Sequence, residues 1–200
     1  MKKQLLATVL LSSLLIPNLL MAADGATIAD DQCTSCHGKN GNSTAGKVPN
    51  IAGFSKAGLI EMLQAYQSGD RKGDKYQAKG EKATDMNAIT KNMSTADIEA
   101  VSAFFASKKF KAAKQSFDAA LAKTGEDIHE KSCEKCHSEQ GKSPDDDTAI
   151  LAGQWTPYLK NEFSKFSSGS RDMTKKMKKK FSPLSNEEKA ALLAFYASLQ

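Results

Sequence analysis

The feature that most restricts this chain is a short cysteine motif that occurs twice. The pattern Cys-x-x-Cys-His stands at residues 33–37 as CTSCH and again at residues 133–137 as CEKCH. Two thiols at this spacing can attach covalently to the two vinyl groups of a haem, and the adjacent histidine can then bind the iron from one face. The pattern therefore predicts two covalently bound haem c groups, attached through Cys33, Cys36, Cys133 and Cys136.

Two other uses of paired cysteines explain less of this pattern. A structural zinc site needs four ligands, with finger-like spacing, and a redox-active dithiol needs only the two cysteines. Neither requires a histidine directly after the second cysteine, and neither explains the same motif 100 residues later. We therefore expect His37 and His137 to be the proximal ligands of the two haem irons.

The repeat extends beyond the cysteine motifs. IAGF at 51–54 matches LAGQ at 151–154 with the same offset of 100. Towards the end of each half the offset falls to 91, because AFFAS at 103–107 matches AFYAS at 194–198. The first half therefore carries nine extra residues, which we expect within 72–85. A repeat of this length predicts an internal duplication into two similar domains.

Residues 1–23 have the composition of a secretory signal peptide. Two lysines precede an apolar run that ends in small residues. A transmembrane anchor is the alternative, but the run is short for a bilayer span and is interrupted by serine, proline and asparagine. We expect an exported, soluble periplasmic protein with domains at 24–112 and 113–200. The stretch at 108–117 would be a linker or a docked helix.

The net charge does not indicate a nucleic-acid partner. Removal of residues 1–23 would lower the formal charge from +5 to +3, because it takes away two lysines and no acidic residue. A net charge this small is too weakly basic to indicate nucleic-acid binding. The lysines of KKMKKKF at 175–181 could attract an acidic redox partner or could simply face solvent.

The spacing of apolar residues predicts an all-α fold. Helices are expected at 56–69 and 156–169, each ending at a glycine that can act as a C-cap. Two further helices are expected to begin after Ser94 and Ser185, which are suitable N-cap residues and have an acidic residue three positions later. No stretch alternates with a period of two for long enough to predict a sheet.

A methionine is expected as the sixth ligand of each iron. Only one histidine, His129, lies outside the motifs, so two bis-histidine haems are excluded. We expect His129 to be a partly exposed helix residue. Met86 and Met177 each lie eight residues before a helix-starting serine, so the offset of 91 relates them. A thioether binds haem iron and raises its reduction potential relative to histidine. Met173 is the main rival to Met177, and core packing is the other common use of methionine.

The proximal histidines should be oriented through their second ring nitrogen. Such a nitrogen usually donates a hydrogen bond to a nearby acceptor. In the first half the carbonyl of Pro49 is the expected acceptor for His37. In the second half the aligned residue is Ala149, so a different backbone acceptor is expected for His137.

These motifs resemble a known family. The segments AKQSFDAALAKTG, CEKCH, ILAGQWTPYL, MTKKM and AFYASLQ are similar to tandem class I cytochromes c, and more closely to the cytochrome subunit of flavocytochrome c sulfide dehydrogenase. The resemblance implies two class I cytochrome c domains. It also implies a periplasmic subunit that accepts electrons from an FAD-containing sulfide dehydrogenase subunit in a heterodimer. The acceptor would be a soluble protein such as a small cytochrome c, and the FAD would belong to the partner.

The residues themselves predict electron transfer without substrate chemistry. Two six-coordinate irons leave no open position for a substrate, so we expect no catalytic residue in this chain and no activity from it alone. The alternative to the sulfide dehydrogenase subunit is a freestanding dihaem carrier that donates to a terminal oxidase or reductase. A haem sensor or peroxidase would need a vacant or labile axial site, which the paired methionines argue against.

Overall fold

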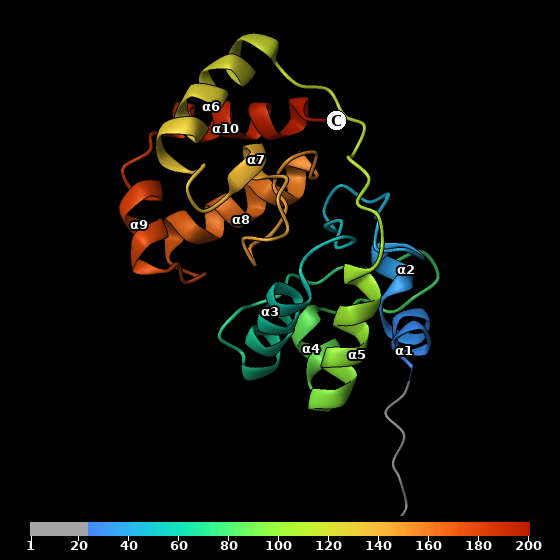
Figure 1. Ribbon diagram of the computed structural model, residues 1–200. Helices are drawn as coiled ribbons and strands as arrows, with labels where there is room; N and C mark the ends of the chain where they lie inside the picture. The colour runs from blue at the N-terminus through green and yellow to red at the C-terminus, as the bar shows by residue number, and fades with distance from the viewer. Residues whose placement is uncertain (1–23) are drawn as a thin grey trace, which may run out of the picture.

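The computed structural model describes residues 24–200 (Figure 1). The predicted signal peptide at 1–23 lies outside this range. Within it the regular elements are ten helices: α1 (Gly25–Gln32), α2 (Thr34–His37), α3 (Lys56–Ser68), α4 (Met86–Thr90), α5 (Thr95–Ala106), α6 (Ala119–Ser132), α7 (Ser138–Gly141), α8 (Thr156–Ser168), α9 (Lys175–Phe181) and α10 (Asn186–Ser198). Among these residues no helix combines the length and apolar character needed to cross a bilayer.

The helices form two groups that follow the order of the chain. In the first, α5 packs against α1 and α3, and α3 also contacts α4; in the second, α10 packs against α6 and α8. Figure 1 shows the two groups joined by an extended segment. This segment spans 107–118 and contains no helix, so 108–117 is a linker and not a docked helix. The all-α fold with two tandem domains is confirmed, while the exact division at 112/113 stays a prediction.

The duplication is visible where the first and last helices of each half cross. A Cβ atom added at Gly25 would lie 2.2 Å from the carbonyl oxygen of Ala100, and one at Gly125 would lie 2.0 Å from that of Ala191. No side chain fits at this separation, so only glycine allows the helices to approach so closely. The two glycines are related by the offset of 100 and the two alanines by 91, as in the sequence repeat.

The predicted helix starts are confirmed at the level of single hydrogen bonds. The hydroxyl of Ser94 accepts from the amide of Asp97 at 3.1 Å, and the carboxylate of Asp97 accepts from the amide of Ser94 at 2.9 Å. Ser185 and Glu188 form the same capping box at 3.1 and 2.8 Å. Helices α3 and α8 end at glycines in the left-handed conformation, also as predicted.

The extra residues of the first half form a short hairpin-like loop. Tyr76 and Thr84 exchange two backbone hydrogen bonds, at 2.8 and 2.9 Å. Gly80 lies between them with a φ of +86°, which favours glycine at the turn. The loop leads directly into Asp85, the N-cap of α4. It therefore delivers the expected axial ligand Met86 to the first residue of that helix.

Candidate haem sites

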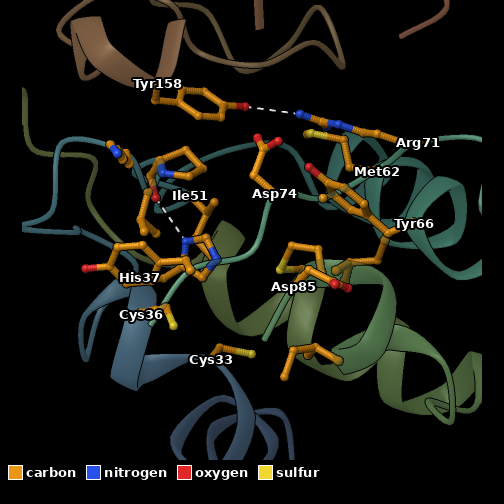
Figure 2. A pocket seen from close by; sticks show the side chains of 18 of the residues that line it. Cys33, Cys36, His37, Ile51, Met62, Tyr66, Arg71, Asp74, Asp85 and Tyr158 are labelled. Atoms are coloured by element: carbon orange, nitrogen blue, oxygen red, sulfur yellow. Dashed lines mark hydrogen bonds between the residues drawn. The ribbon is translucent and has the colours of Figure 1, made fainter. Parts of the chain in front are cut away.

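The first half encloses a cavity of about 580 Å³ beside its cysteine motif. Figure 2 shows Cys33, Cys36 and His37 together on one side of this cavity. Met86 also lines it, and apolar side chains make up much of the remaining wall: Val48, Ile51, Phe54, Leu59, Leu63, Ile89, Val101 and Phe105. An apolar cavity of this size, with a few polar groups at its edge, is typical of a cofactor site. The residues therefore fit a haem attached through the two thiols.

The electrostatic state of the first cysteine also fits thioether attachment. Burial, together with repulsion from Cys36, raises the pKa of Cys33 to about 12. A redox-active dithiol needs the opposite, a lowered pKa that stabilises the thiolate. The dithiol alternative is therefore disfavoured by the surroundings of Cys33.

His37 is held in the orientation that a proximal ligand needs. Its Nδ1 lies 3.0 Å from the carbonyl oxygen of Pro49. A carbonyl can only accept, so Nδ1 carries the proton and Nε2 keeps its lone pair for iron. Burial lowers the pKa of His37 and outweighs the opposite effect of the Pro49 hydrogen bond, which favours the neutral imidazole. The predicted role of Pro49 as acceptor is confirmed.

Met86 is positioned by the residue that follows it. The side-chain amide of Asn87 donates to the carbonyls of Tyr66 at 2.6 Å and Arg71 at 2.8 Å, and its oxygen accepts from the amide of Gly73 at 2.8 Å. These three bonds fasten α4 to the end of α3. The second half has Lys178 at the position of Asn87, so its methionine loop lacks this clamp.

Three methionines reach the first cavity. Met62 and Met93 line it together with Met86. Met93 also belongs to the hydrophobic core of the first half and is 8% exposed, which fits a packing role. The repeat relates only Met86 to a methionine of the second half at the offset of 91, so the assignment of Met86 as the sixth ligand stays a prediction.

The second motif folds differently from the first. Residues 133–136 form a turn in place of the one-turn helix α2. The Nδ1 atom of His137 lies 3.2 Å from the hydroxyl oxygen of Thr148. The expectation of a backbone acceptor for His137 is therefore wrong, because the loop before Ala149 presents a side-chain hydroxyl to the imidazole.

His129 is buried, and the expectation of a partly exposed residue is also wrong. It is 0% exposed because α6 packs across α10 at this point. Its Nε2 lies 2.8 Å from the carboxylate of Glu134 and 3.1 Å from the carbonyl of His137, while Nδ1 lies 3.0 Å from the hydroxyl of Tyr196. Both neighbours of Nε2 are acceptors, so Nε2 carries the proton. His129 thereby anchors the backbone of the proximal histidine.

Glu134 organises the loop after the second motif. Its carboxylate accepts from the amides of Glu139 at 2.8 Å and Gln140 at 3.1 Å. These two residues have φ values of +54° and +62°, a strained conformation for side chains of this type. The sequence contained a signal for this network, since His129 and Glu134 replace Ala29 and Thr34 of the first half.

Met177 and its rival Met173 are both half-buried, at and just before α9. Five lysines of α9 are exposed around Met177, and none forms a salt bridge with an acidic residue in the described part of the chain: Lys175, Lys176, Lys178, Lys179 and Lys180. The assignment of Met177 as the sixth ligand stays a prediction, with Met173 as its rival.

The second half contributes part of the wall of the first cavity. Residues of α8 line this cavity, among them Tyr158, Glu162 and Lys165. The guanidinium of Arg71 donates to the hydroxyl of Tyr158 at 3.2 Å, the contact drawn in Figure 2. The indole of Trp155 donates to the carbonyl of Ser43 at 3.0 Å. The aromatic residues of this segment therefore pack at the interface between the halves.

Two helical domains, each with one Cys-x-x-Cys-His motif, define a dihaem class I cytochrome c with two covalently bound haem c groups. Comparison with known proteins agrees, since the Cytochrome c family matches residues 22–109. The chain is 30% identical over 179 residues to cytochrome c4 of Stutzerimonas stutzeri, covering 84% of each protein. It is 28% identical over 205 residues to cytochrome c4 of Azotobacter vinelandii, covering 95% of this chain and 96% of that one. The chain belongs to the cytochrome c4 family.

Solved structures give the same result. The crystal structure of reduced recombinant cytochrome c4 from Pseudomonas stutzeri matches with a TM-score of 0.71 and 27% identity, over 88% of this chain and 97% of that chain. A thiosulfate dehydrogenase from Marichromatium purpuratum matches with a TM-score of 0.69 and 23% identity, over 87% of this chain and 39% of that chain. This second likeness concerns the fold alone.

Proposed function

We propose that this chain is an exported, freestanding dihaem electron carrier of the periplasm that donates electrons to a terminal oxidase or reductase. The observation that carries the proposal is the match to cytochromes c4 along nearly the whole chain. The haems supply the one-electron chemistry, and the protein supplies attachment, axial ligands and an apolar surrounding.

Each residue of the two motifs then has a role. Cys33, Cys36, Cys133 and Cys136 hold the two haems covalently. His37 and His137 are the proximal ligands, supported by the hydrogen bonds of their Nδ1 atoms to Pro49 and Thr148. Met86 and Met177 complete the coordination. With both irons closed in this way, the chain carries electrons without binding a substrate at the metal.

The lysines of α9 support an acidic redox partner at the second half. Lys175 and Lys179 are four residues apart, as are Lys176 and Lys180, and such like-charge pairs destabilise a helix. The corresponding helix α4 of the first half begins after Asp85 and contains no lysine. A helix that carries five lysines despite this cost favours docking of an acidic protein there, where the positive charge would speed encounter.

A sulfide dehydrogenase flavoprotein subunit is the second candidate partner. The observation on its side is the resemblance of residues 113–178 and of the C-terminus to the cytochrome subunit of flavocytochrome c. The comparisons with known proteins do not support this partnership, and they favour the freestanding carrier.

Purification from the periplasm with a count of haem and flavin tests the proposal. We expect two haems per chain, no flavin in the cytochrome fractions, and an N-terminus near residue 24. The purified protein should run as a monomer or homodimer. A flavoprotein that copurifies in equal amount, and without which sulfide does not reduce the haems, would replace the carrier with the second candidate.

A further inference from the structure

Three cations from both halves of the molecule meet at one buried carboxylate. Glu162 lies on α8, and its side chain is 5% exposed. It accepts hydrogen bonds from Arg71 at 2.9 Å, from Lys165 at 3.1 Å and from Arg171. Arg71 belongs to the first half and Arg171 to the second, at equivalent positions of the repeat. One carboxylate is thus the counter-ion of two repeat-related arginines.

The duplication supplies two arginines but only one such carboxylate. At the offset of 100, the position of Glu162 is occupied in the first half by Met62. Both arginines stack on an aromatic ring, Arg71 over Tyr66 at 4.6 Å and Arg171 over Phe166 at 4.5 Å. The side chain of Arg71 is 7% exposed, so it would be a buried uncompensated cation without Glu162.

The charges of this cluster are kept at neutral pH. Burial by itself would raise the pKa of Glu162, but the charges of Arg71, Arg171 and Lys165 outweigh it and hold that pKa below its usual range. Arg71 keeps its positive charge despite its burial, because a guanidinium is not deprotonated in proteins. Glu162 is therefore an anion between permanent cations.

The cluster forms part of the wall of the first haem cavity. Arg71, Glu162 and Lys165 all line it. The Nε atom of Arg71 is buried and has no hydrogen-bond partner within the described residues, so a donor remains available at this wall. A charge in such an apolar surrounding is weakly screened and acts on a nearby redox centre.

We propose that Glu162 couples the two haem sites electrostatically, by compensating Arg71 and Arg171 together. A ferric haem carries one more positive charge than a ferrous haem, so an uncompensated cation nearby favours the ferrous state. Glu162 then lowers the reduction potentials of both haems at once. Glu162 acts through the charges of the two arginines and does not contact the iron.

The test compares Glu162→Gln with Glu61→Gln in the holoprotein. Glu61 is an exposed carboxylate on α3, so its variant removes the same charge outside the cluster. Spectroelectrochemical titration should show that both midpoint potentials rise in Glu162→Gln, and that they still do so at high salt. In Glu61→Gln both midpoint potentials should be nearly unchanged. Glu162→Asp keeps the negative charge, so both potentials should stay close to the wild-type values. A Met177→His background lowers the potential of the second haem and identifies its wave.

A second variant keeps the test decisive if Glu162→Gln does not fold. Arg171→Gln removes one cation and leaves Glu162 paired with Arg71, so the second-haem potential should fall by more than the first. A shift of only one wave in Glu162→Gln, an equal shift in Glu61→Gln, or no shift in Arg171→Gln would each overturn the proposal. The measurement needs no redox partner, so its result is independent of the carrier function.

Discussion

A single glutamine of the second half holds the backbone beside the proximal ligand of the first. The side chain of Gln154 is almost completely buried, and its oxygen accepts from the amide of Asn50 at 2.9 Å. Its nitrogen donates to the carbonyl of the same residue, also at 2.9 Å. Asn50 directly follows Pro49, whose carbonyl orients His37. Gln154→Met should therefore weaken both the interface and the orientation of this histidine.

The size of the effect follows from the groups left without partners. Methionine has a similar length, so the main loss is the pairing of one buried amide and one buried carbonyl of Asn50. The amide of Trp155 also donates to Gln154, at 3.1 Å, but it is only partly buried and its loss adds less. Each unsatisfied group costs about 1–3 kcal/mol, which gives a loss of about 2–6 kcal/mol in the free energy of unfolding. This is a large fraction of the stability of a small domain, which is about 5–15 kcal/mol.

Guanidinium unfolding of the holoprotein, followed by haem absorbance and Trp155 fluorescence, measures this loss. Amide hydrogen exchange at Asn50 reports the same site directly and should be faster in Gln154→Met. Gln64→Met is the matched control, because Gln64 is exposed on α3. A loss in Gln154→Met no larger than in the control, with Asn50 still protected, would refute this account of the interface.

Four further predictions concern the haem sites and their surroundings. Thr148→Val removes the hydroxyl at 3.2 Å from Nδ1 of His137, so the second-haem potential should rise in potentiometric titrations, whereas Thr148→Ser should keep the wild-type value. Met86→Ala and Met177→Ala should each remove one methionine-to-iron charge-transfer band; loss of a band in Met173→Ala instead would give that role to Met173. Glu162 has a lowered pKa in the folded state, so its contribution to stability is complete above its ordinary pKa of 4.5 and is lost as the pH falls through the folded pKa. Urea unfolding should therefore show that the destabilisation by Glu162→Gln shrinks progressively below about pH 4.5. The triple variant Lys178→Glu, Lys179→Glu and Lys180→Glu reverses three charges of α9 and should slow electron transfer with an acidic flavodoxin about tenfold or more at low salt. The same change at Lys79, Lys82 and Lys91 of the first half should have little effect. Equal slowing by the two triple variants would contradict docking at α9.

Much of the fold was predictable because its signals are local. Helix starts at Ser94 and Ser185 depend on hydrogen bonds over three residues, and those bonds are present. The duplication was readable because offsets of 100 and 91 preserve whole segments. Even the long-range acceptor Pro49 was predictable, since the first half follows the pattern of class I cytochromes c without departure at this point.

The site was predictable only where it follows the repeat. The sequence by itself determined the two haem attachment motifs, the helices that frame them and the candidate ligands, because this chemistry depends on residues close together in the chain. It did not determine the acceptor of His137 or the burial of His129, where the second half departs from the first.

Only the tertiary structure decided which residues of the two halves contact each other. Arg71 and Glu162 are 91 residues apart and Asn50 and Gln154 are 104 apart, and no local pattern links them. Their role depends on burial, since the same charges and amides in water would interact weakly. The packing of the second half against the first buries all four of these side chains, so their polar contacts are shielded from water and link the two halves.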